Sequence, residues 1–96
     1  MNTSTKEQHL VILTGASRGM GRAIGEQLLA RPGHMLVGIS RGVSQELAAA
    51  PKGEGSALEQ WPHDLDDATQ AAAHLSQWLA GVPAGRFASA TLINNA

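Results

Sequence analysis

Short apolar runs alternate along this chain with longer stretches in which apolar residues recur every three or four positions. The first run, residues 10–13, is apolar throughout, which is typical of a strand buried on both faces of a parallel sheet. Similar runs cover residues 35–40 and 90–96, and residues 57–61 alternate as a weaker strand pattern does, with Pro62 directly after them. The pattern therefore predicts four short strands.

Two longer helices are predicted between these strands. The first begins near Met20 and ends before Pro32 and Gly33, because proline and glycine stop helices. Its expected inward stripe is Met20, Ala23, Ile24, Gln27 and Leu28. The other runs from the aspartates at 66 and 67, either of which can cap it, to Gly81 and Pro83. Its expected stripe is Ala68, Ala71, Ala72, Leu75 and Leu79.

A third, shorter helix is expected over residues 46–50, with Ser44 as its N-cap. Strands and helices therefore alternate along the chain, and the series begins and ends with a strand. Strands joined by helices form parallel sheets through right-handed crossovers, with helices on both faces. The sequence thus predicts one α/β domain over residues 1–96, without internal repeats or a linker.

Composition narrows the function classes. The chain has 96 residues, 43% of them hydrophobic, and a formal net charge of −1, which is typical of one soluble globular unit. Its seven Lys and Arg residues are scattered, so we expect no nucleic-acid or membrane partner. The absence of cysteine excludes disulfides and thiolate zinc sites. Because the polar start has no signal-peptide core and no apolar run nears ~20 residues, a cytoplasmic location is expected.

Three glycines lie between the first strand and the first helix, in the segment TGASRGMG. A helix N-terminus presents unpaired backbone N–H groups and a positive dipole end, which suits a phosphate. We expect Gly15 to permit the tight bend, Gly19 to let a pyrophosphate approach the backbone, and Gly21 to bring helix and strand together. The spacing is G-x-x-x-G-x-G, and no Lys follows the last glycine as it would in a Walker motif.

This segment, Thr14 to Gly21, resembles the cofactor-binding signature of the short-chain dehydrogenase/reductase family. Two other motifs agree: Asp64-Leu65 is similar to the family's adenine-contacting pair, and NNA, residues 94–96, to its Asn-Asn-Ala-Gly motif. The resemblance extends over residues 10–96. It implies a three-layer, Rossmann-like doubly wound sheet with strand order 3-2-1-4 and a nucleotide crevice between strands one and four. It also implies that the chain is the N-terminal half of an NAD(P)-binding domain, truncated after the fourth strand.

The resemblance implies roles for particular residues. Asp64 would accept from the adenine amino group, Leu65 would border the ring, and Asn95 and Ala96 would lie beside the adenine-side ribose. Asn94 would brace neighbouring strands, and Thr14 would anchor the turn through its hydroxyl. Residues expected along the pyrophosphate and the adenosine phosphate are Gly15, Ser17, Arg18 and Met20, beside the other turn glycines, Gly19 and Gly21.

The end of the second strand predicts the choice of cofactor. A site for NAD places Asp or Glu there, to bond both ribose hydroxyls. This chain has Ser40 and Arg41 instead, with Arg18 in the glycine turn on the same side. Guanidinium groups bind a 2′-phosphate by charge-assisted hydrogen bonds. We therefore expect NADP(H).

The resemblance implies an oxidoreductase that moves a hydride between the nicotinamide and a small carbonyl or alcohol substrate, as a homo-oligomer when full length. The family uses a Ser, a Tyr and a Lys for catalysis, and this chain contains no tyrosine. We predict no catalytic residue within it. Two alternatives stay open: a non-catalytic NADP(H)-binding redox sensor, and a flavodoxin-like domain, which the three glycines disfavour and which bound-flavin absorbance would reveal.

Other residues carry weaker hypotheses. His63 and the nearby aspartates could suggest a metal site, but an adenine contact and helix caps account for them better, so no metal is predicted. Trp61 and Trp78 are more typical of packing than of a ligand pocket.

We expect this chain alone to have no dehydrogenase or reductase activity, because it has no tyrosine to act as the proton donor and no lysine after Lys52 to lower a phenol's pKa. The measurement is NADPH consumption by the purified chain with a panel of ketones and aldehydes. The same assay on a complete member of the family is the positive control. Consumption above the enzyme-free background would contradict the prediction.

Overall fold

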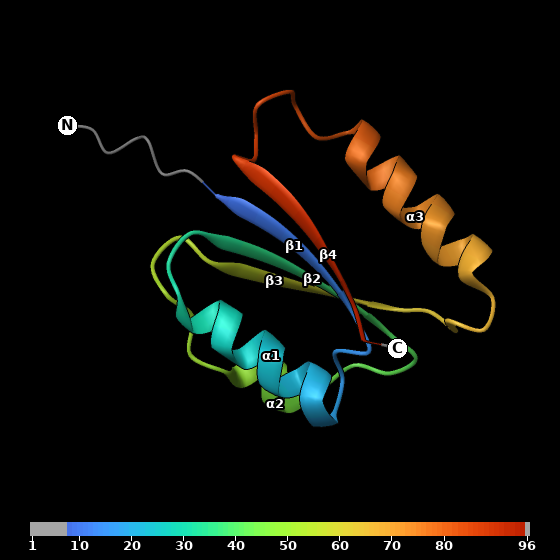
Figure 1. Cartoon of the computed structure of the whole chain (residues 1–96), viewed down its shortest axis with the longest axis horizontal. Helices are drawn as coiled ribbons and strands as arrows, with labels where there is room; N and C mark the ends of the chain where they lie inside the picture. The colour runs from blue at the N-terminus through green and yellow to red at the C-terminus, as the bar shows by residue number, and fades with distance from the viewer. Residues whose placement is uncertain (1–7, 96) are drawn as a thin grey trace.

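The structure is a computed structural model that describes residues 8–95. Strands and helices alternate along the whole described chain (Figure 1), which confirms the predicted order of elements. The elements are β1 (His9–Thr14), α1 (Gly19–Ala30), β2 (His34–Ser40), α2 (Gln45–Ala49), β3 (Ala57–Pro62), α3 (Ala68–Ala80) and β4 (Ser89–Asn94).

The four strands form one parallel sheet in the order β3-β2-β1-β4, as predicted. Leu10 of β1 lies opposite Met35 of β2 on one side and Ala90 of β4 on the other. Helices α1 and α2 cover one face of the sheet and α3 the other (Figure 1). The structure is therefore a partial Rossmann-like α/β fold. Successive strands are added on one side of β1 up to β3, and β4 is then added on its other side, so the switch point lies between β1 and β4.

Alternation along the two central strands builds a core on each face of the sheet. Leu10 and Ile12 point to the face that α3 covers, whereas Val11 and Leu13 point to the face of α1 and α2. The α3 face also buries Met35, Val37, Ile39, Trp61 and Ala71. The opposite face buries Ala16, Leu29, Leu36 and Leu47. Because both faces of β1 are covered, side chains pointing to either face are buried, and this explains why residues 10–13 are all apolar.

The inward stripe predicted for α1 is wrong at three positions. Met20 is 72% exposed, and Ala23 and Gln27 are also exposed. The helix instead buries every fourth residue, at Gly21, Gly25 and Leu29, with Ile24 and Leu28 partly buried beside them. The two glycines bring the helix axis close to the sheet. A pattern of apolar side chains could not identify them as inward-facing, because glycine has no side chain.

The prediction for α3 needs a similar correction. Ala71 is buried and Leu75 packs against the core, but Ala68, Ala72 and Leu79 are exposed. The inward face is instead completed by Trp78, whose ring meets that of Trp61 edge-on at 5.6 Å. Both tryptophans therefore serve packing, as predicted. The inward face of α3 therefore passes through Ala71, Leu75 and Trp78 rather than through the alanines at 68 and 72 and Leu79.

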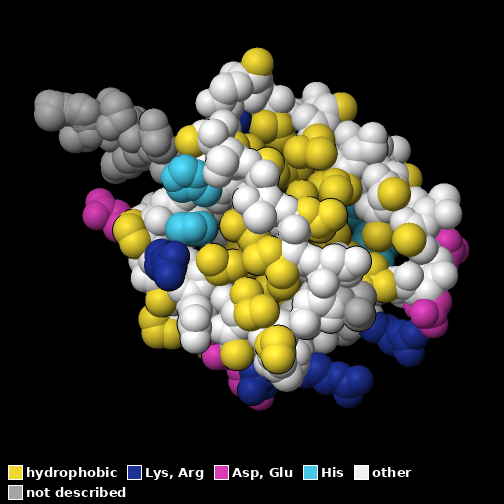
Figure 2. All heavy atoms as spheres, viewed as in Figure 1, with side chains coloured by type: hydrophobic (Ala, Val, Ile, Leu, Met, Phe, Trp, Pro, Cys, Tyr) yellow, Lys and Arg dark blue, Asp and Glu magenta, His cyan; other side chains and the backbone are white. Residues whose placement is uncertain are grey.

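Strands β3 and β4 form the two edges of the sheet. Pro62 has no backbone N–H to donate. It is tolerated as the last residue of β3 because β3 is an edge strand, with no neighbouring strand on its outer side. Among the described residues, strand β4 pairs with β1 alone, and its Leu92 is 64% exposed. Figure 2 shows hydrophobic side chains gathered over the central part of the view, where Figure 1 places the sheet. The fourth strand ends at Asn94 rather than Ala96, which lies outside the described residues.

The predicted caps are confirmed. The Ser44 hydroxyl accepts from the Leu47 N–H at 3.0 Å, and the Asp67 carboxylate accepts from the Thr69 N–H at 3.3 Å. Of the two candidate aspartates, Asp67 is thus the cap of α3. Across residues 8–95, none of the helices has the length and apolar character that crossing a bilayer requires.

Candidate functional site

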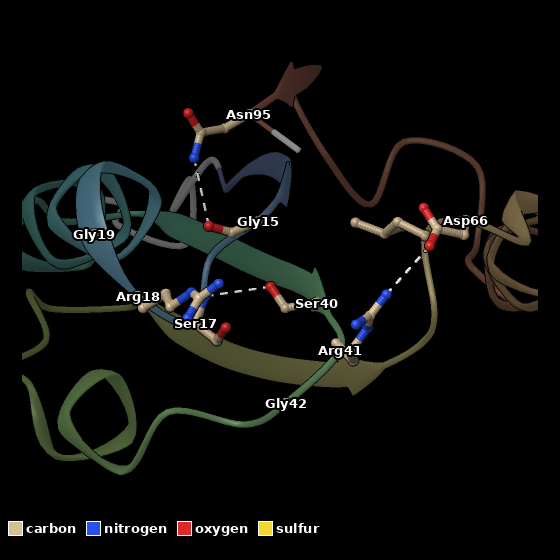
Figure 3. Close-up of a pocket in the computed structure, with 10 residues that line it drawn as sticks. Gly15, Ser17, Arg18, Gly19, Ser40, Arg41, Gly42, Asp66 and Asn95 are labelled. Carbon is tan, nitrogen blue, oxygen red and sulfur yellow. Dashed lines mark hydrogen bonds and ion pairs between the residues drawn. The ribbon is translucent and has the colours of Figure 1, made fainter.

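A pocket of about 940 Å³ opens at the carboxyl ends of the strands, beside the turn that joins β1 to α1 (Figure 3). A pocket of this size can hold a cofactor. In an open α/β sheet, this edge beside the switch point is where ligands bind. The lining residues are Gly15, Ser17, Arg18, Gly19, Ser40, Arg41, Gly42, Leu65, Asp66 and Asn95.

The structure shows what each of the three turn glycines permits sterically. Gly15 and Gly19 both adopt the left-handed conformation, with φ of 69° and 61°. A Cβ on Gly19 would meet no atom within 4 Å, so the backbone there is open to an approaching group. A Cβ on Gly21, in contrast, would overlap the carbonyl oxygen of Gly15. Gly21 is therefore a packing residue, and it does not line the pocket.

Ser40 fixes the turn from the end of β2. Its side chain is only 5% exposed, and its hydroxyl oxygen accepts from the Ala16 N–H at 2.6 Å and the Ser17 N–H at 3.2 Å. The hydroxyl thus satisfies two backbone donors that would otherwise lack partners. Ser40, which was expected beside a ribose, lines the pocket, and its hydroxyl oxygen holds the glycine turn in place.

Thr14 joins the turn to the end of β4. Its hydroxyl donates to Asn94 Oδ1 at 2.8 Å and accepts from the backbone N–H of Asn95 at 2.9 Å. The Asn95 amide in turn donates to the carbonyl of Gly15 at 3.4 Å (Figure 3). These contacts place Thr14 and Asn94 in the bracing roles that the resemblance implied, and they bring Asn95 to the pocket.

The N-terminus of α1 faces the pocket without a side-chain cap. Its N-cap residue, Arg18, has an extended backbone and makes no capping hydrogen bond, and the first turn of the helix contains no acidic residue. The first N–H groups of a helix have no partner within it. They are therefore available to an anion in the pocket, which the helix dipole would favour.

Arg41 reaches across the pocket toward the segment after β3. Its Nη2 lies 3.2 Å from Asp64 Oδ1 and 3.3 Å from Asp66 Oδ2. Asp64 Oδ1 also accepts from the backbone N–H of Asp66 at 3.0 Å. This backbone hydrogen bond and the Arg41 guanidinium lower the pKa of the Asp64 carboxyl below its ordinary value. Asp64 is thus ionised at neutral pH.

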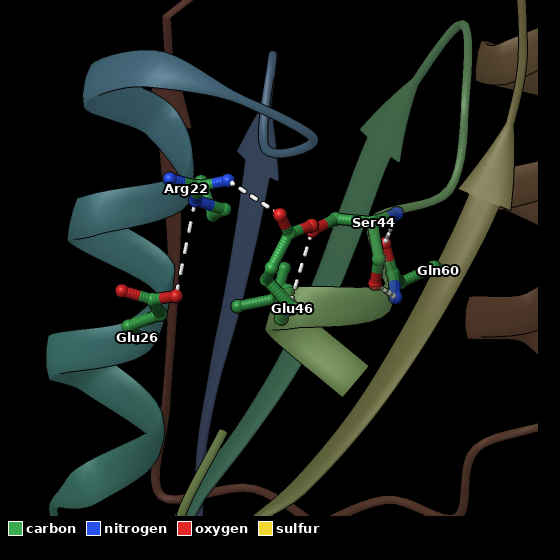
Figure 4. Close-up of polar contacts among 6 residues, drawn as sticks. Arg22, Glu26, Ser44, Glu46 and Gln60 are labelled. Atoms are coloured by element: carbon green, nitrogen blue, oxygen red, sulfur yellow. Dashed lines mark hydrogen bonds and ion pairs between the residues drawn. The ribbon is translucent and has the colours of Figure 1, made fainter. Parts of the chain in front are cut away.

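The loop that carries Arg41 and Gly42 is held at its far end. The backbone N–H of Ser44 donates to Gln60 Oε1, and Gln60 Nε2 donates back to the Ser44 carbonyl, each at 2.9 Å (Figure 4). On the outside, Arg22 of α1 lies 3.4 Å from the Glu46 carboxylate of α2. An exposed pair of this kind adds little stability. The Gln60 contacts are what fix the loop to β3.

The pocket brings together most of the residues predicted from the sequence: Gly15, Ser17, Arg18, Gly19, Ser40, Arg41, Leu65 and Asn95. Met20, Gly21 and Asp64 do not line it, and Ala96 lies outside the described residues. Gly42 and Asp66 line the pocket but were not predicted to. The sequence suggested Asp66 as a helix cap or, less favourably, as part of a metal site with His63. Its place in the sequence, two residues after the predicted site residue Asp64, could have indicated that it also lies at the pocket.

His63 makes a side-chain contact that the sequence did not reveal. Its Nε2 lies 2.8 Å from Nδ1 of His74 on α3, and the His74 ring stacks on Trp61 with centroids 3.8 Å apart. Between residues 8 and 95, no group of three or more His, Asp or Glu side chains is placed to hold a metal ion.

Comparison with known proteins gives one informative match. No protein-family model matches the chain, and neither does any curated protein. Among solved structures, it is similar to a short-chain dehydrogenase/reductase from Burkholderia vietnamiensis, with 32% sequence identity and a TM-score of 0.65. The similarity covers 93% of this chain and 41% of that one, so this chain spans less than half of that protein. The family resemblance is thus confirmed: the chain has the fold of part of a short-chain dehydrogenase/reductase.

The separate roles of two glycines predict unequal effects on stability. Gly21→Ala is expected to lower the free energy of unfolding by about 3 kcal/mol, because its Cβ would overlap a backbone carbonyl. Gly19→Ala is expected to cost only about 1 kcal/mol, from the left-handed backbone alone. Urea unfolding of both variants measures the difference. Equal losses, or a larger loss for Gly19→Ala, would contradict the assigned roles.

Proposed function

We propose that the pocket binds NADP(H) and that the chain forms the cofactor-binding part of an oxidoreductase of the short-chain dehydrogenase/reductase type. One observation carries the proposal: the uncapped N-terminus of α1 opens into the same pocket as the guanidinium groups of Arg18 and Arg41. Two separate sites for anions in one pocket suit a dinucleotide that carries both a pyrophosphate and a 2′-phosphate.

The pyrophosphate would lie against the glycine turn. The open backbone at Gly19 lets a phosphate approach the first N–H groups of α1, and the Ser17 hydroxyl stands in the same wall. The turn is preorganised, because Ser40 and Thr14 hold it through hydrogen bonds within the protein. Binding would therefore require little ordering of the backbone.

The adenosine end would lie between the segments after β2 and β3. Leu65 offers the apolar surface for the adenine ring, and Asn95 lines the other side of the pocket. No acidic residue ends β2, where an NAD site would need one to bond the ribose hydroxyls. Arg41 stands there instead, and it can donate charge-assisted hydrogen bonds to a 2′-phosphate.

When bound, the cofactor would supply hydride transfer to or from a carbonyl or alcohol carbon. The residues of this chain would bind and orient it, and they include no tyrosine to hold the substrate proton. The second candidate is a non-catalytic NADP(H) sensor. A Tyr-x-x-x-Lys motif in a longer form of the chain would favour the enzyme, and its absence there would favour the sensor. A cytoplasmic location and a homo-oligomeric full-length protein are part of the proposal.

Arg41→Asp should reverse the cofactor preference of the protein. A hydrogen bond to a charged group is worth roughly 1.5–3 kcal/mol, so we expect the unmodified protein to bind NADPH about 10- to 100-fold more tightly than NADH. The variant loses the attraction for the phosphate and adds a repulsive charge. Calorimetric titration of both proteins with both nucleotides measures the change.

Arg31→Asp is the matched control, since it makes the same charge change at the far end of α1, on an exposed residue outside the pocket. It should leave the ratio of the two affinities unchanged. Equal or tighter binding of NADH by the unmodified protein would overturn the choice of NADP(H).

A further inference from the structure

Asp66 is a pocket residue with no role in the helix beside it. It lies between Leu65 and the cap residue Asp67, and Asp67 alone supplies the capping hydrogen bond of α3. The Asp66 side chain is 88% exposed, and its carboxylate contacts Arg41. Its negative charge therefore acts on the pocket, opposite the residue proposed above to bind the 2′-phosphate (Figure 3).

Both carboxylates contact the same nitrogen of the guanidinium. Asp64 and Asp66 each lie against Nη2 of Arg41, which carries two N–H bonds. The N–H bonds on Nε and Nη1 make no hydrogen bond or ion pair to any other residue between 8 and 95. An incoming phosphate could thus reach the guanidinium, but it would stand beside two negative charges.

The two carboxylates are not held equally. Asp64 is fixed by a second hydrogen bond, from the backbone N–H of Asp66, and its side chain is the less exposed of the two, at 58%. The Asp66 carboxylate is joined to the described protein by the Arg41 contact alone. Asp64 therefore positions the guanidinium, and Asp66 is the partner that an incoming anion can replace.

We propose that the Asp66 carboxylate occupies Arg41 as a built-in competitor of the 2′-phosphate, and so limits the preference of the pocket for NADP(H) over NAD(H). This inference rests on the proposed function. To bind NADP(H), the phosphate must displace this carboxylate from Nη2 or lie beside it. A nucleotide without the phosphate has no such conflict, because Asp66 continues to compensate the charge of Arg41.

The test is calorimetric titration of the Asp66→Asn variant with NADPH and with NADH. Exposed ion pairs are weak, so we expect NADPH to bind about two- to fivefold more tightly and NADH to change less than twofold. The gain should shrink as salt screens the carboxylate. Asp66→Ser removes the same charge with a smaller side chain and should give the same result.

Asp67→Asn is the matched control, because it removes one negative charge from the next residue, which lies outside the pocket, and asparagine is also a good cap. It should change the NADPH affinity less than twofold. In a protein that already carries Arg41→Gln, Asp66→Asn should also have no effect, since there is no guanidinium to compete for.

The outcomes separate this inference from the proposed function. If the unmodified protein binds neither nucleotide, the proposed function fails, and the inference fails with it. If it binds NADPH but Asp66→Asn leaves that affinity unchanged or weakens it, only the inference is overturned. An equal gain from Asp67→Asn, or a gain that survives Arg41→Gln, would also overturn it, because the effect would then be one of net charge.

Discussion

The rest of the site depends on the close approach of Gly21 to the carbonyl of Gly15. No side chain fits between them, so α1 begins directly against the end of β1 and points its first N–H groups into the pocket. A bulkier residue would push the helix away from the sheet, and with it the anion site. The left-handed Gly15 and Gly19 turn the chain sharply enough to permit this contact.

Short polar side chains then fasten the turn to the neighbouring strands. Ser40 from β2 accepts from two turn N–H groups, and Thr14 of β1 is bonded to the end of β4. The Ser40 hydroxyl satisfies two N–H groups that the tight turn leaves without regular pairing, and the Thr14 hydroxyl satisfies the N–H of Asn95 after β4. The apolar core holds the sheet and helices together, and these few hydrogen bonds set the shape of the pocket at its edge.

The sequence was a good guide wherever local chemistry decides the structure. The strands, the caps at Ser44 and Asp67, and the geometry of the glycine turn follow from apolar runs, N-cap preferences and turn sterics. The orientation of the helices was less predictable, because glycines form the inward face of α1 and Trp78 lies on the inward face of α3. The bond between Arg41 and Asp66 joins loops after different strands, so only the folded sheet could reveal it. That these residues bind NADP(H) is still a prediction.

Amide chemical shifts of the ¹⁵N-labelled chain, followed by NMR as NADPH is added, test the central claim most directly. The account predicts that shifts concentrate on the turn and first helical residues, 15–21, and on the loops at residues 41–42 and 65–66. A second cavity, which Trp78 of α3 and Phe87 before β4 help to line, lies outside the proposed site and serves as an internal reference. Shifts centred on that cavity, or none at the glycine turn at saturating NADPH, would contradict the account.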